Sequence, residues 1–103
     1  MNVDVIKKAR DTIANGNWWK GSARSGDCPE KVCAVTALSD ACNDLRLGLG
    51  DREKVIQFVD KFVPPTERPN LRPLAAFNDS PSTTSQDVMD VFDKALAELG
   101  GLS

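Results

Sequence analysis

The sequence predicts an all-α protein, folded as a compact single domain of about four helices across residues 1–103. Apolar residues recur at spacings of three, four and seven positions in several segments, which is the period of a helix with one buried face. Capping residues, glycines or prolines bound each of these segments. The 103-residue chain is 41% hydrophobic and 27% charged, an ordinary globular composition that supplies one modest core.

The last predicted helix, about residues 84–99, has the clearest pattern. Thr84 is a suitable helix start, because its hydroxyl can accept the backbone N–H of Asp87, and Asp87 itself lies near the positive end of the helix. Gly100-Gly101 closes the helix. One face is apolar throughout, formed by Val88, Val91, Phe92, Ala95 and Leu99.

The first predicted helix covers about residues 4–15. Asn15-Gly16 ends it, because both residues tolerate the left-handed conformation that closes a helix. Its inward stripe consists of Val5, Ile6, Ala9 and Ile13.

Two further helices are expected in the middle of the chain. The segment of about residues 30–46 carries mostly small apolar side chains, which let neighbours approach closely, so we expect it at the centre of the bundle. The segment of about residues 51–63 opens at Asp51 and ends before Pro64-Pro65.

An extended, proline-rich loop is expected over residues 64–82, before the last helix. Prolines at positions 64, 65, 69 and 73 stiffen its first part. Its second part, Phe77-Asn78-Asp79-Ser80-Pro81, has the composition of a polar turn.

The sequence contains no histidine, which excludes imidazole as a catalytic base or metal ligand and with it Ser-His-Asp and Cys-His catalysis. The three cysteines, Cys28, Cys33 and Cys42, form no CxxC pair, so we expect no zinc site, and no cofactor motif is present. Cys33 and Cys42 fall on nearly opposite sides of the expected helix and cannot bridge each other. The spacing leaves a bridge from Cys28 to Cys33 open, but we favour reduced thiols, with Cys33 and Cys42 buried and Cys28 the most reactive.

Charge is unevenly distributed around the net value of −2. Residues 1–24 carry five basic and two acidic side chains, whereas residues 78–103 carry one basic and five acidic side chains. The two ends can pair with each other, or present faces of opposite sign, and mutual neutralisation is the simpler interpretation. The basic cluster of Lys7, Lys8 and Arg10 is equally consistent with a solvated helix face and with docking on an acidic surface.

No apolar run approaches the roughly 20 residues that span a bilayer, and no signal-peptide pattern opens the sequence. We therefore expect a cytoplasmic protein without membrane association.

Three segments together resemble a domain-of-unknown-function family found in actinobacteria and their phages. These are Gly16-Asn17-Trp18, Cys33-Ala34-Val35-Thr36-Ala37-Leu38, and Phe77-Asn78-Asp79 followed by Thr84 and Val88. The resemblance covers most of the chain, although glycine stands in the family pattern where this chain has Thr36, and an aromatic residue, often tryptophan, stands where it has Phe77. The resemblance implies no activity; it implies a cytoplasmic protein of phage or actinobacterial origin.

Trp18-Trp19-Lys20, with Arg24 nearby, is the first candidate site. We expect Trp18 to fill the core and Trp19 to stay partly exposed, so that Trp19, Lys20 and Arg24 form a contact surface for a partner protein. Aromatic rings beside cations also suit base stacking and phosphate neutralisation, but the acidic net charge makes nucleic-acid binding the less favoured interpretation.

Asn78 and Asp79 are the second candidate site. Asp79 has the chemistry of a general base or cation ligand, and both residues also have the chemistry of turn formers that bond neighbouring backbone groups. The structural interpretation is favoured.

The sequence therefore favours a small non-enzymatic protein that binds a host or viral protein, without cofactor or metal. The alternative is a small-ligand-binding protein or minor hydrolase using Asn78 and Asp79, and nucleic-acid binding ranks third.

Overall fold

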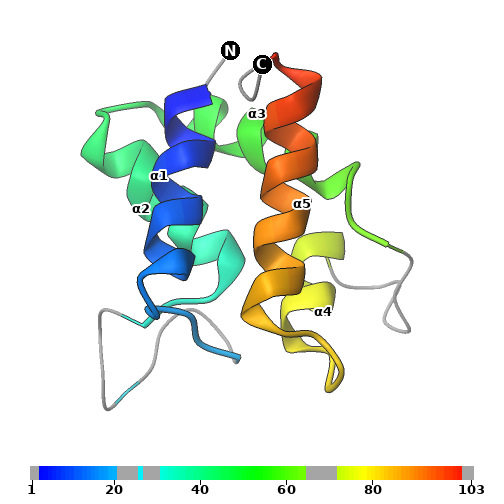
Figure 1. Cartoon of the computed structure of the whole chain (residues 1–103). Coiled ribbons are helices and arrows are strands. Elements are labelled where there is room, and N and C mark those ends of the chain that lie inside the picture. Colours follow the sequence, from blue (N-terminus) through cyan, green and yellow to red (C-terminus); the bar gives the residue numbers. More distant parts are fainter. Residues whose placement is uncertain (1–2, 21–25, 27–30, 65–71, 101–103) are drawn as a thin grey trace.

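The computed structural model describes residues 3–20, 26, 31–64 and 72–100. These residues form five helices: α1 (Val3–Ala14), α2 (Ala34–Asp44), α3 (Leu49–Asp60), α4 (Pro73–Asp79) and α5 (Ser85–Glu98). The all-α prediction is confirmed, and α4 is the helix that the sequence did not predict. Figure 1 shows α1 and α5 side by side and running in opposite directions, with the short α4 close to the first turns of α5.

The core lies where the inner faces of these helices meet. α1 packs against both α2 and α5, and α2 also contacts α3 and α4, which fits the predicted central position of α2. The buried residues of α2 include Ala34, Ala37 and Ala41, so its backbone can approach its neighbours closely. Phe92 of α5 is the largest fully buried side chain.

Local sequence signals fix two of the helix ends. Gly16 follows α1 at a φ of 87°, a left-handed conformation that glycine adopts without a steric cost. At the start of α5, Thr84 accepts the Asp87 backbone N–H at 3.2 Å, and the Asp87 carboxylate accepts the Thr84 backbone N–H at 2.9 Å. This reciprocal pair is a capping box, and it confirms Thr84 as the helix start.

The two middle helices have different bounds from those predicted. α2 begins at Ala34 rather than near residue 30, because residues 31–33 are not helical and Val32 instead pairs with Trp18 in an isolated parallel bridge. α3 begins two residues before Asp51, with Gly48 as its cap residue, and ends at Asp60.

The predicted extended loop over 64–82 is wrong for its second half. α4 occupies Pro73–Asp79, so the expected polar turn at Phe77 to Asp79 is the last turn of a helix. Proline is favoured in the first helical turn, where its missing N–H costs nothing, and the N–H of Leu74 is satisfied by the Asp60 carboxylate at 3.0 Å. Residues 65–71 lie outside the described part of the chain.

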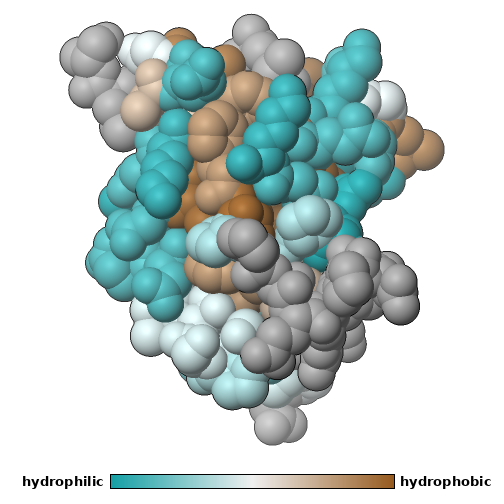
Figure 2. All heavy atoms as spheres, turned by 90° about the vertical axis from the view of Figure 1, so that its right-hand side faces the viewer, coloured by the Kyte–Doolittle hydropathy of each residue, from teal (hydrophilic) through white to brown (hydrophobic). Residues whose placement is uncertain are grey.

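Apolar side chains are not confined to the interior. Figure 2 shows a hydrophobic strip at the centre of one face, between two columns of hydrophilic residues. Phe58 and Phe62 on the α3 side and Leu99 after α5 are only partly buried against the core. In the described part of the chain, none of the helices has the length and apolar character that crossing a membrane requires.

Candidate functional site

The tryptophan pair lies on a short extended segment that follows α1. Trp19 donates its backbone N–H to the carbonyl of Val32 at 2.9 Å, and Val32 donates its own to the carbonyl of Asn17 at 2.9 Å. These bonds attach the segment to the residues that lead into α2. The backbone of the segment is therefore held by Val32, which lies just before α2.

Asn78, at the end of α4, completes this attachment. Its side chain has no solvent exposure. Its Oδ1 accepts from Trp18 Nε1 at 2.6 Å and from the Ala34 backbone N–H at 3.0 Å, while its Nδ2 donates to the Trp19 carbonyl and to Asp79 Oδ1, both at 3.1 Å. An amide side chain has two acceptor positions and two donor hydrogens, so all four are used.

Asn78 and Asp79 both bond to other groups of the protein itself. Asn78 is not in a turn; it joins the end of α4, the tryptophan segment and the first residue of α2. Asp79 is partly buried, and its carboxylate accepts from the neighbouring Asn78 amide. The sequence favours a local structural role for these residues, but it gives no sign of a contact between positions 60 residues apart.

Trp19 is partly exposed, as the sequence predicts, but Trp18 does not fill the core as expected. Trp18 is partly buried, packs against the core and is held through its indole N–H. Trp19 is 37% exposed, one of three large apolar residues in the described part of the chain that remain exposed. Both its backbone N–H and its carbonyl are bonded, so an exposed ring stands on a fixed backbone.

The ammonium of Lys20 is hydrogen-bonded to other groups of the same chain, although the residue is exposed. Its Nζ donates to the carbonyls of Ser80 and Pro81 at 2.8 and 3.1 Å, and lies 5.6 Å from the centre of the Trp18 ring. The structure thus brings Trp19, Lys20, Asn78 and Asp79 into one region, which we call the tryptophan site. Arg24, the third residue of the predicted contact surface, lies outside the described residues.

The described cysteines are free and buried, as predicted. Cys33 does not lie within the helix; it caps α2, and its Sγ accepts the Thr36 backbone N–H at 3.4 Å. Burial raises the pKa of the Cys42 thiol, which favours its unreactive protonated form. Cys28 lies outside the described residues.

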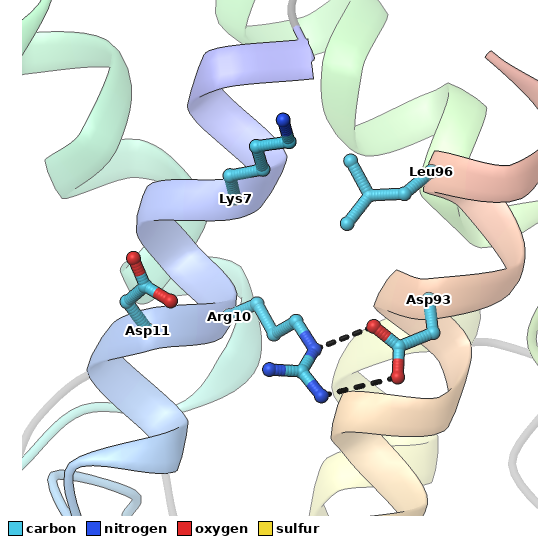
Figure 3. A pocket seen from close by; sticks show the side chains of 5 residues that line it. All are labelled: Lys7, Arg10, Asp11, Asp93 and Leu96. Atoms are coloured by element: carbon cyan, nitrogen blue, oxygen red, sulfur yellow. Dashed lines mark hydrogen bonds and ion pairs between the residues drawn. The ribbon is translucent and has the colours of Figure 1, made fainter. Parts of the chain in front are cut away.

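A pocket that the sequence did not predict lies between α1 and α5. Its volume is about 400 Å³, and its lining residues are Lys7, Arg10, Asp11, Asp93 and Leu96. Figure 3 shows Arg10 and Asp93 meeting across the gap between the two helices, with Lys7 and Leu96 farther along it. The Arg10 Nη2 to Asp93 Oδ2 distance is 3.2 Å, and a second bond joins Nε to Oδ1.

The sequence contained one signal for the contact beside this pocket, namely the opposite charge of the two ends of the chain. The Arg10–Asp93 pair confirms that the basic first helix and the acidic last helix meet. The hydrogen bond and the charge of Asp93 raise the pKa of Arg10, so the guanidinium remains charged. Charge pattern alone could not show that the helices would leave a hollow beside the pair.

Comparisons with known proteins give a family but no characterised relative. No curated protein and no solved structure matches the chain. A family model described as a family of unknown function, DUF6197, matches residues 2–98. Because this match extends over nearly the whole sequence, the chain belongs to the DUF6197 family.

Proposed function

We propose that this protein is a non-enzymatic binding protein that recognises another protein, of host or viral origin, with Trp19 as its anchor. The resemblance described above supports an actinobacterial or phage origin, and with it action in the cytoplasm. A protein partner is favoured over nucleic acid, because the net charge is −2 and the ammonium of Lys20 already bonds backbone carbonyls.

The observation that carries the proposal is an exposed tryptophan on a fixed backbone. Trp19 is 37% exposed while its N–H and carbonyl are held by Val32 and Asn78. Tryptophan is among the residues that contribute most to protein interfaces. An anchor whose backbone is already ordered loses less conformational entropy on binding than one on a free loop, which increases affinity.

The test is a comparison of two exposed apolar residues. Trp19→Ala should weaken binding to a partner isolated with the wild-type chain by at least about 2 kcal/mol, roughly thirtyfold in Kd. Leu49→Ala removes a side chain that is 72% exposed at the start of α3, and should leave the Kd unchanged. Isothermal titration calorimetry with the purified partner gives both values.

Circular dichroism of both variants provides the control for folding. Equal affinity of the wild type and a folded Trp19→Ala variant contradicts the proposal. Equal loss in both variants also contradicts it, because the contact would then not depend on Trp19 in particular.

The alternative, a small ligand or substrate at Asn78 and Asp79, has weaker support. Every hydrogen-bonding position of Asn78 is occupied by the protein itself, so a ligand there would have to break an internal bond.

A further inference from the structure

The short helix α4 is held at its first turn by one carboxylate of α3. With seven residues, α4 is too short to be stable on its own in water, so it depends on tertiary contacts. Asp60 accepts the Leu74 N–H at 3.0 Å, and its other oxygen lies 3.7 Å from Nε of Arg72, the residue that precedes α4. The Asp60 side chain is only 15% exposed. Removing this carboxylate therefore leaves α4 less firmly attached at its start.

The end of α4 is bonded to the tryptophan segment, residues 17–20, and to the start of α2. Asn78 accepts the Trp18 indole N–H at 2.6 Å and donates to the Trp19 carbonyl at 3.1 Å. Its oxygen also accepts the Ala34 N–H at 3.0 Å. Just beyond the helix, two backbone carbonyls accept the ammonium of Lys20. These bonds are lost together when α4 leaves its place.

The longer helices α1, α2 and α5 are held by apolar packing instead. They have 12, 11 and 14 residues, and α1 packs against both of the others. Large side chains such as Ile6 of α1 and Phe92 of α5 are fully buried in this packing, whereas Leu74 is the one large apolar side chain that α4 fully buries. A segment held mainly by a few polar bonds opens at a lower free energy than the core of the same protein.

We propose that α4 and the tryptophan segment open and close as one cooperative unit, and that Asp60 stabilises its closed form. Asn78 is the link, because it belongs to α4 and bonds both tryptophans. The coupling is a property of the free protein. Its consequence for partner binding, namely that Trp19 is presented on a fixed backbone only while α4 is docked, rests on the proposed function.

Native-state hydrogen exchange of the full chain, followed by ¹H–¹⁵N NMR, tests whether this unit exists. Three N–H groups report on it: the backbone of Ala76 in α4, the indole of Trp18, and the backbone of Ala34. In the wild type they should give one common free energy of opening. That value should be lower than the value for the backbone N–H of Phe92, which is buried in α5 and reports unfolding of the core.

Variants of Asp60 test its role in the same experiment. Asp60→Ala should speed exchange at all three reporters by the same factor, about tenfold, the loss expected from one charge-assisted hydrogen bond. Asp60→Asn keeps an oxygen for the Leu74 N–H and should restore most of the protection. Asp44→Ala removes an exposed carboxylate at the end of α2 and should change exchange at the reporters by less than about twofold.

Three results would overturn the proposal. The first is an equal free energy of opening for Phe92 and the three reporters in the wild type, which means that no unit opens apart from the core. The second is faster exchange of Ala76 alone in Asp60→Ala, which means that α4 detaches while the tryptophan segment stays in place. The third is an equal effect of Asp60→Ala and Asp44→Ala.

The comparison within the wild type requires no variant to fold. None of these measurements uses a partner, so their outcome is separate from the affinity test of Trp19.

Discussion

Asn78 is the residue at which three distant parts of the chain meet. Its oxygen serves the indole N–H of Trp18 and the backbone N–H of Ala34, and its nitrogen serves the carbonyl of Trp19. These partners belong to the tryptophan segment and to the first turn of α2. A single buried amide therefore sets the relative positions of α4, α2 and the proposed anchor.

Replacing Asn78 with Ala should destabilise the fold by about 2–4 kcal/mol. The reason is that two donors, the Trp18 indole and the Ala34 N–H, would lose their partner away from solvent. Urea unfolding followed by tryptophan fluorescence measures the difference. Asn43→Ala is the matched control, since Asn43 is exposed near the end of α2, and its effect should stay within about 0.5 kcal/mol.

A loss of less than 1 kcal/mol in Asn78→Ala would show that water or a rearranged neighbour replaces the missing oxygen. The same variant informs the functional proposal, because Trp19 would lose one of the two bonds that fix its backbone. Its ring should then bind a partner more weakly even where the fold persists.

At the scale of helices, the junction of α3 and α4 is held by charged side chains. Asp60 accepts the Leu74 N–H at 3.0 Å and lies 3.7 Å from Arg72 Nε, and Arg72 also pairs with Glu53. Burial raises the pKa of Asp60 above its ordinary value of 3.8, although the Leu74 bond and Arg72 act in the opposite direction.

Asp60 should therefore make stability depend on pH in a defined direction. A carboxyl with a raised pKa in the folded state binds its proton more tightly when folded, so its contribution is present below the unfolded pKa and is lost as pH rises through the folded pKa. Wild type should thus lose stability relative to Asp60→Asn as pH increases from 3.8 upward. The amide keeps an oxygen for Leu74 but does not titrate.

Urea unfolding of both proteins at a series of pH values isolates this effect, because the other titrating groups are common to both. A difference that is constant with pH would contradict the raised pKa. A difference that changes in the opposite sense would show that Arg72, rather than burial, dominates.

The helices differ in how well the sequence predicts them, because only some are stabilised by local signals. α1 and α5 were recognisable because each has a long apolar stripe and a local end signal, Gly16 and Thr84 respectively. α4 was not, because its seven residues make only two turns and Pro73 indicates a turn as readily as a helix start. What stabilises α4 is the Asp60 carboxylate and the contacts of Asn78, neither of which is local in sequence.

At the scale of the whole molecule, oppositely charged side chains from the two ends of the sequence meet. Arg10 of α1 pairs with Asp93 of α5, and Lys8 Nζ lies 3.7 Å from Asp44 Oδ2 of α2. The sequence predicted the pairing of the ends, but no local pattern could locate the pocket beside it. Such a hollow depends on how the packed helices diverge, which is a property of the assembled core.

Because both side chains of the Arg10–Asp93 pair are about one-third exposed, its contribution to stability should be small. A double-mutant cycle with Arg10→Gln and Asp93→Asn should give a coupling energy below about 1 kcal/mol. Salt should reduce it further through screening. Urea unfolding of the four proteins at low and high salt measures this, and a coupling of several kcal/mol that resists salt would contradict the prediction.

The antiparallel contact of α1 and α5 also has a consequence for biosynthesis. During translation α1 emerges from the ribosome long before α5, so the α1 side chains that α5 covers in the folded protein stay uncovered while the intervening helices are made. The nascent polypeptide must therefore tolerate exposed apolar surface on its first helix. Any chaperone binding to this surface should end when α5 has been synthesised and covers it.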